Sequence, residues 1–289
     1  MNDNRIPIVD KTHLLEESKT FCMFPWLHLN VTPKGDIYPC CSNNYTDPFG
    51  NTKETSLKEA FNSDKMKQLR LDMLNGKKNS VCDFCYKHEE AGPHSFRNYS
   101  KEHWGKDFDE LVPQTQPDGT MPDFKMKYYD IRFSNICNFK CRTCGSAFSS
   151  KWEQEDLESR EQTGLPMYAI ELEKGNREEF ILEVLKQVPN FEIAYFAGGE
   201  PLITEEHYML IDEMIAKKKT DIQLRYNTNI SNLKFKKRDI FKLWQHFEKP
   251  IQIYASIDHF GEKAEYIRYG TKWKTIETNL KKLKKAKNI

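Results

Sequence analysis

The chain has 289 residues, with 44 Lys and Arg against 43 Asp and Glu, which gives a formal net charge of +1. This length allows one large domain or two smaller ones, and the charge balance excludes a general attraction to nucleic acids or acidic membranes. No apolar run approaches the ~20 residues that span a bilayer. The opening segment also lacks the basic and apolar parts of a signal peptide. We therefore expect a cytoplasmic protein that binds neither membranes nor nucleic acids.

The eight cysteines are not scattered, because they occur in close groups or frame a predicted hairpin. In a reducing cytoplasm they are not expected to form disulfides, so their grouping indicates metal ligation. They are Cys22, Cys40, Cys41, Cys82, Cys85, Cys137, Cys141 and Cys144.

The first part of the chain predicts a small mixed module. Residues 1–20 are a polar lead-in, and apolar and polar residues then alternate as a strand over 27–31. A turn at 33–35 returns the chain as a second strand at 36–39. A Ser-x-x-Glu capping box predicts a helix over 56–76. The second cysteine pair follows this helix.

The second part of the chain predicts alternating strands and helices. Residues 101–124, rich in Pro, Gln and Gly, predict a linker before it. The strand candidates are 128–133, 193–196, 222–226 and 251–255. The helix candidates are 178–188, 205–219, 238–247 and 273–285. This alternation is typical of a parallel α/β sheet or barrel.

Three cysteines follow the first of these strands with the spacing Cys-x3-Cys-x2-Cys: Cys137, Cys141 and Cys144. Three thiolates on one loop can converge on one inorganic centre. A closed structural zinc site normally takes four protein ligands. A cubane iron–sulfur cluster on three cysteines leaves one iron open to a small molecule. Zinc and chance spacing remain the alternatives.

This triplet resembles the hallmark of the radical S-adenosylmethionine (SAM) superfamily, in which it follows the first barrel strand. The resemblance implies a 4Fe–4S cluster on the three cysteines, with SAM chelating the open iron. It also implies reductive cleavage of SAM to a 5′-deoxyadenosyl radical, which abstracts hydrogen from a substrate. Thr143 departs from the family, where an aromatic or aliphatic residue commonly packs near the adenine.

Polar loops follow the other three predicted strands. Ala-Gly-Gly-Glu-Pro resembles the family's element for the SAM amino group, Asn-Thr-Asn resembles a turn at the same mouth, and Ser-Ile-Asp resembles a Ser-x-Asp motif. A glycine turn or a helix cap is the structural alternative for each loop. The resemblance assigns SAM contacts to Gly198, Gly199, Glu200, Pro201, Asn229, Ser256 and Asp258.

The amino-terminal cysteines resemble a SPASM or twitch module, an auxiliary iron–sulfur domain, over residues 21–100. The resemblance rests on the spacing Cys-x12-Gly-x4-Cys and on Cys-x2-Cys. It implies a second cluster on Cys22, Cys40, Cys82 and Cys85, with Cys41 as an alternative to Cys40. The module usually follows the barrel, whereas here it precedes it. A structural zinc site is the open alternative.

The predicted fold is therefore α/β, with this small α+β module ahead of a radical SAM core at residues 125–289. About four strand–helix units indicate a partial barrel, which we expect to be truncated. The resemblance implies a flavodoxin- or ferredoxin-type electron donor and, by analogy alone, a peptide or protein substrate. The alternative is a non-catalytic iron–sulfur or zinc-binding fragment with an electron-transfer or interaction role. The sequence names neither the substrate nor the bond that is broken.

Overall fold

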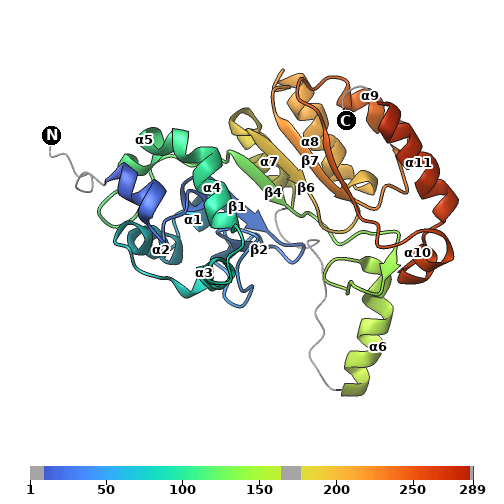
Figure 1. Cartoon of the computed structure of the whole chain (residues 1–289), viewed down its shortest axis with the longest axis horizontal. Coiled ribbons are helices and arrows are strands. Elements are labelled where there is room, and N and C mark those ends of the chain that lie inside the picture. The colour runs from blue at the N-terminus through green and yellow to red at the C-terminus, as the bar shows by residue number, and fades with distance from the viewer. Residues whose placement is uncertain (1–9, 164–176, 287–288) are drawn as a thin grey trace. The chain divides into compact units, whose positions relative to one another are not determined.

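The computed structural model of the chain describes residues 10–163, 177–286 and 289. The chain divides into two compact units (Figure 1). Unit 1 runs to Asn30 and resumes over Asp36–Lys127, and unit 2 takes Val31–Gly35 and Tyr128–Ile289. Among the helices in the described ranges, none combines the length and the apolar character that crossing a membrane requires.

Unit 1 combines a small sheet with short helices. Its strands lie in the order β1 (His28–Val31), β2 (Asp36–Tyr38) and β3 (Gly50–Asn51), and β3 runs antiparallel to β2. Its α-helices are α1 (Leu57–Phe61), α2 (Asp64–Leu74), α3 (Asp83–Glu90), α4 (Phe96–Trp104) and α5 (Phe108–Leu111). Short helical turns are η1 (His13–Glu17), η2 (Phe24–Trp26), η3 (Ser80–Cys82), η4 (Gly105–Asp107) and η5 (Val112–Gln114). The hairpin predicted over residues 27–39 is formed by β1 and β2.

The helix predicted over residues 56–76 forms as two helices. The predicted capping box is present and opens α1. Ser63 then caps α2, because its hydroxyl accepts the N–H of Met66. Between the two helices, the side chain of Asn62 donates to the carbonyl and accepts the N–H of Met121, both at 2.9 Å. The chain therefore turns at Asn62, where this long-range contact replaces a continuous helix.

Residues 101–124, which were expected to form a linker, hold the end of α4, the helix α5 and the turns η4 and η5. Trp104 and Phe108 are buried. Gly119 has a φ of +86°, and a Cβ there would lie 2.4 Å from the carbonyl oxygen of Lys67 in α2. The segment therefore packs against the helices of unit 1 and is not a free linker.

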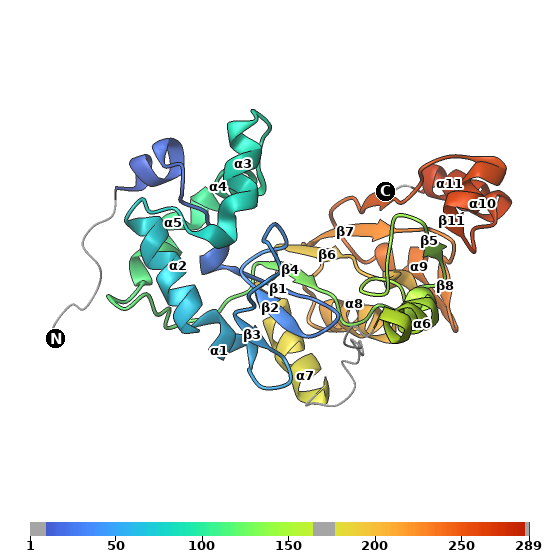
Figure 2. The same cartoon turned by 90° about the horizontal axis from the view of Figure 1, so that it is seen from below.

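Unit 2 is built on four parallel strands in sequential order: β4 (Tyr128–Ile131), β6 (Ile193–Phe196), β7 (Gln223–Thr228) and β10 (Gln252–Ala255). Each strand pairs with the one before it in this series, and the carboxyl ends of all four lie at one edge. These strands confirm the four predicted strand positions, with ends that differ by up to two residues. Helices lie along one face of the sheet (Figures 1 and 2).

The helices of unit 2 include two that the sequence did not predict, α6 and α10. They are α6 (Glu153–Thr163), α7 (Arg177–Gln187), α8 (Glu205–Ala216), α9 (Ile240–Trp244), α10 (Gly261–Ile267) and α11 (Trp273–Lys285), with turns η6 (Ser150–Trp152), η7 (Val188–Asn190) and η8 (Pro201–Ile203). Short strands pair antiparallel as β5 (Lys140–Cys141) with β11 (Arg268–Tyr269), and as β8 (Lys234–Phe235) with β9 (Arg238–Asp239).

Each unit has its own aromatic core. Rings in the core of unit 1 belong to Phe21, Phe24, Trp26, Trp104 and Phe108. Rings in the core of unit 2 belong to Tyr129, Phe196, Tyr208, Tyr226 and Trp244. Each unit therefore has a buried aromatic core of its own.

Candidate functional site

A cavity of about 310 Å³ opens in unit 2 at the carboxyl ends of β4, β6, β7 and β10. Loops that follow all four strands contribute to its lining. The cysteines that line it are Cys137, Cys141 and Cys144, and the other expected residues that line it are Gly198, Gly199, Glu200, Asn229 and Ser256. These residues meet because parallel strands bring their carboxyl ends to one edge, which is where ligands bind in α/β folds.

Two of the three thiols of the cysteine loop accept hydrogen bonds, one from within the loop and one from a residue far along the chain. The N–H of Phe139 donates to Cys137 Sγ over 3.4 Å, and the guanidinium of Arg268 donates to Cys141 Sγ over 3.7 Å. Burial raises the pKa of Cys137 to about 11, and it also raises the pKa of Cys141. Without a bound cation these two thiols are therefore protonated at neutral pH. A metal centre would have to displace their protons.

The pairing of β5 with β11 brings the segment that follows α10 onto the cysteine loop. Arg268 lies opposite Cys141 in this pair, and the N–H of Arg142 donates to the carbonyl of Ile267 over 2.9 Å. Asp258 accepts from Arg268 Nε over 2.6 Å. Asp258 thus lies beside the cavity rather than in its lining, and it orients the arginine that contacts a cysteine sulfur.

The two glycines after β6 allow that turn to pack on the cysteine loop. Gly199 has a φ of +57°, and a Cβ there would lie 2.4 Å from the carbonyl oxygen of Ile136. Gly198 has a φ of +83°, and a Cβ there would meet the side chain of Arg132 at 2.9 Å. The N–H of Glu200 donates to the same Ile136 carbonyl over 2.8 Å. Only glycine combines this backbone conformation with so close an approach.

The carboxylate of Glu200 is buried and accepts three hydrogen bonds. Its Oε1 accepts from Leu202 N–H at 3.1 Å and from the Thr228 hydroxyl at 2.6 Å, while its Oε2 accepts from Asn229 N–H at 2.7 Å. Burial outweighs these bonds and raises the pKa of Glu200 to about 7. A carboxylate has about four acceptor positions, so Oε2 keeps one for a further donor. A buried carboxylate with a raised pKa favours a cationic partner.

The loop after β7 is tied to the cysteine loop as well. Asn229 Nδ2 donates to Asn138 Oδ1 over 3.0 Å, and Asn138 Nδ2 donates to the hydroxyl of Ser231 over 2.9 Å. Asn279 of α11 donates to the carbonyl of Ile230 over 2.8 Å. The predicted turn therefore braces the cysteine loop and lines the cavity at the same time.

Pro201 and Thr143 differ in where the structure places them. Pro201 is buried at the start of η8 and does not belong to the lining of the main cavity, whereas Thr143 does. Pro201 fixes the exit of the turn, since its restricted φ suits the first position of a helical turn.

Several residues of the cavity were not predicted: Arg132, Phe148, Tyr195 and Arg268. The position of Arg132, directly after β4, was an available signal because carboxyl-end residues of parallel strands line such sites. The guanidinium of Arg132 lies 5.5 Å from the ring centre of Phe148 and 3.3 Å from the Asp130 carboxylate. No local pattern marks Phe148 or Tyr195, which reach the cavity only through the fold.

The cysteines of unit 1 form a second group. Cys22 and Cys85 are buried, while Cys40, Cys41 and Cys82 are partly exposed, and all are free thiols. Burial raises the pKa of Cys40 well above its ordinary value, and the charges of the other four cysteines raise it further. The five cysteines therefore influence one another electrostatically, although loops far apart in the sequence carry them.

Both donor sets consist of free thiols, which is the ligand type that iron–sulfur clusters take. In the described residues, no three His, Cys, Asp or Glu side chains are drawn together as a ligand set for a metal ion. Ionisation of these thiols requires a cation nearby, which a cluster supplies.

Comparison with protein families identified two matches. Residues 22–86 match the SPASM iron–sulfur cluster-binding domain, and residues 131–289 match the radical SAM superfamily. Searches of curated proteins and of solved structures gave no match. The first match implies auxiliary iron–sulfur chemistry, and the second implies a 4Fe–4S cluster and SAM. Because the second match covers more than half of the 289 residues, the chain belongs to the radical SAM superfamily, with a SPASM module ahead of its radical SAM domain.

Proposed function

We propose that the chain is a radical SAM enzyme whose SAM-binding cluster is held by Cys137, Cys141 and Cys144. The observation that carries this proposal is the cavity of unit 2, in which the three thiols and Glu200 line one space. The chemistry supplied by the bound cluster and SAM would be reductive cleavage of SAM to a 5′-deoxyadenosyl radical that abstracts hydrogen from the substrate.

The residues of the cavity have complementary roles in this proposal. Glu200 Oε2 accepts a hydrogen bond from the ammonium group of SAM, because a buried carboxylate without a cationic partner is costly. Ser256 and Asn229 contribute polar groups for the ribose or the carboxylate. The two glycines let the backbone approach the ligand. Asp258 acts through Arg268, which it orients toward Cys141.

Phe148 offers the apolar surface that Thr143 lacks. Both residues line the cavity, and the ring of Phe148 is oriented by the guanidinium of Arg132. An aromatic ring stacks on a purine more favourably than a threonine methyl group does. We therefore assign the adenine contact to Phe148.

In unit 1 we propose an auxiliary cluster on Cys22, Cys40, Cys82 and Cys85, with Cys41 as the alternative to Cys40. An electron donor of the flavodoxin or ferredoxin type and a peptide or protein substrate are proposed by analogy with SPASM proteins alone. For the fold, the sequential order of four parallel strands supports part of a (β/α) barrel. The reducing cytoplasm is the compartment that suits eight free cysteines.

The test is anaerobic reconstitution with iron and sulfide, followed by EPR of the reduced protein with and without SAM. A Cys137→Ala/Cys141→Ala/Cys144→Ala variant is the matched control. The proposal expects a signal that shifts with SAM in the native protein and is lost in the variant, with 5′-deoxyadenosine formed only by the former. A SAM-insensitive signal, or zinc in place of iron, would instead identify a non-catalytic metal protein.

A further inference from the structure

Helix α4 contacts the proposed auxiliary ligand Cys22 and is joined by an ion pair to α3, the helix that carries Cys85, although α4 begins ten residues after the matched SPASM region ends. The hydroxyl of Ser100 in α4 lies 3.1 Å from Cys22 Sγ. A hydroxyl beside a ligand sulfur is the kind of group that the outer shells of iron–sulfur sites contain.

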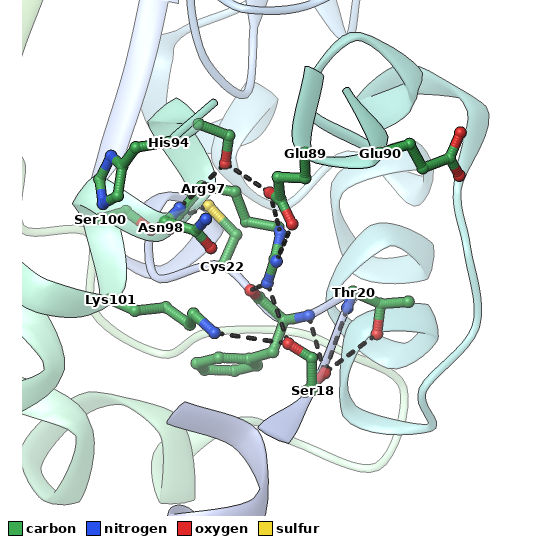
Figure 3. Close-up of polar contacts among 12 residues, drawn as sticks. Ser18, Thr20, Cys22, Glu89, Glu90, His94, Arg97, Asn98, Ser100 and Lys101 are labelled. Atoms are coloured by element: carbon green, nitrogen blue, oxygen red, sulfur yellow. Dashed lines mark hydrogen bonds and ion pairs between the residues drawn. The ribbon is translucent and has the colours of Figure 1, made fainter. Parts of the chain in front are cut away.

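Arg97 joins the two segments that carry these cysteines (Figure 3). Its Nη1 donates to the carbonyls of Ser18 and Phe21, at 3.1 and 2.9 Å, which fixes the backbone just before Cys22. Its Nε donates to the carboxylate of Glu89 at 2.9 Å, and its Nη2 also contacts that carboxylate. Glu89 belongs to α3, the helix that carries Cys85.

Burial makes this arrangement specific. The side chain of Arg97 is 3% exposed and that of Glu89 is 17% exposed. A planar guanidinium can satisfy two carbonyls and a carboxylate at once, and a lysine ammonium cannot reproduce that fork. Lys101, one turn further along α4, adds a second positive charge and lies 3.4 Å from the Ser18 carbonyl.

We propose that α4 is the outer shell of the auxiliary cluster, in which Ser100 hydrogen-bonds the Cys22 sulfur and Arg97 positions the Cys22 and Cys85 segments. This inference rests on the proposed assignment of Cys22 and Cys85 as ligands. Ser100 and Arg97 are positioning residues, because both act through the cysteines.

The hydroxyl proton of Ser100 has two acceptors within reach. One is the carbonyl of Arg97 at 2.7 Å, and the other is Cys22 Sγ. The N–H of Met23 donates to the same hydroxyl oxygen at 3.0 Å, so this oxygen is held in place. A thiolate ligand carries negative charge and is the stronger acceptor, so the proton turns to Cys22 when the cluster is bound.

A hydrogen bond to a ligand sulfur stabilises the more negative, reduced cluster. Loss of the Ser100 hydroxyl should therefore lower the reduction potential of the auxiliary cluster. Loss of the Arg97 fork should instead loosen the ligand segments, since a lysine cannot bond the Phe21 carbonyl, the Ser18 carbonyl and the Glu89 carboxylate at once.

The experiment uses the Cys137→Ala/Cys141→Ala/Cys144→Ala background, in which only the auxiliary cluster contributes to the EPR spectrum. Ser100→Ala should lower the reduced-to-oxidised ratio at a fixed potential at least tenfold, which for one electron is about 59 mV. Arg97→Lys should lose iron to a chelator at least tenfold faster. Ser63→Ala, which removes a helix cap in unit 1, is the control for general loosening and should leave the potential unchanged.

An unchanged potential in Ser100→Ala together with an unchanged rate of iron loss in Arg97→Lys would overturn this inference and leave the cluster assignment intact. A background protein that binds no iron would overturn both. A potential shift of equal size in Ser63→Ala would show a structural effect and would also overturn the inference.

Discussion

Glu200 shows at the scale of one residue how burial and hydrogen bonding compete. Three donors favour its ionised form, yet desolvation prevails and the pKa rises to about 7. Thr228 and Asn229 supply two of these donors from the neighbouring strand end. The protein thus holds the carboxylate in place but does not neutralise its charge. A cationic ligand would do so.

This raised pKa predicts a pH-dependent stability of the ligand-free protein. Between the ordinary carboxyl pKa of 4.5 and about 7, the folded state keeps a proton that the unfolded state has lost. The free energy of unfolding should therefore fall, relative to Glu200→Gln, by on the order of 3 kcal/mol as pH rises through this window. Urea unfolding of both proteins at several pH values measures the difference, and parallel curves would contradict the prediction.

At the scale of elements, the site depends on loops that touch one another. The turn after β6 packs on the cysteine loop through Gly199, and the loop after β7 joins the same loop through Asn138. The pair of β5 and β11 adds a third contact. Three elements therefore hold one cysteine loop in position. A change in any of them should alter the amount of metal that the loop binds.

Gly199→Ala tests this dependence. The new Cβ would lie 2.4 Å from the Ile136 carbonyl at a positive φ, so we expect a loss of about 2–4 kcal/mol in stability and little iron on the triplet. Gly145→Ala, in the cysteine loop on which Gly199 packs, is the control, because no atom lies within 4 Å of its Cβ position. It should change stability by less than about 0.5 kcal/mol. Urea unfolding and iron analysis check both variants, and equal iron in the two would refute the expectation.

At the scale of the whole molecule, the chain carries two separate groups of free cysteines, one in each compact unit. The amino-terminal group has five thiols for one cluster of four ligands, and the sequence leaves Cys40 and Cys41 as alternatives. Cys40 is the position that the Cys-x12-Gly-x4-Cys spacing selects, and the charges of the other four cysteines raise its pKa.

Cys40→Ala should therefore lose the auxiliary cluster, whereas Cys41→Ala should keep it. The expected loss is about four iron atoms per chain, together with a lower melting temperature, because metal binding stabilises the folded module. The SAM-sensitive EPR signal should persist in both variants. Iron analysis and thermal unfolding measure these effects, and a greater iron loss in Cys41→Ala would reverse the assignment.

The sequence by itself determined the features that short local patterns encode. Cysteine spacing predicted both groups of thiols, and alternation of strand and helix patterns located all four parallel strands. The capping box was found for the same reason, since its two residues lie three positions apart. The one helix predicted across Asn62 was wrong, because a contact with Met121, far along the chain, divides it.

Only the tertiary structure decided which distant residues meet. Arg132, Phe148 and Arg268 line the cavity through the order of the strands and the pairing of β5 with β11. The contact of Ser100 with Cys22 spans 78 positions, a separation over which no sequence periodicity carries information. Local spacing reveals which chemistry a loop can hold, whereas chain packing determines the groups that surround it.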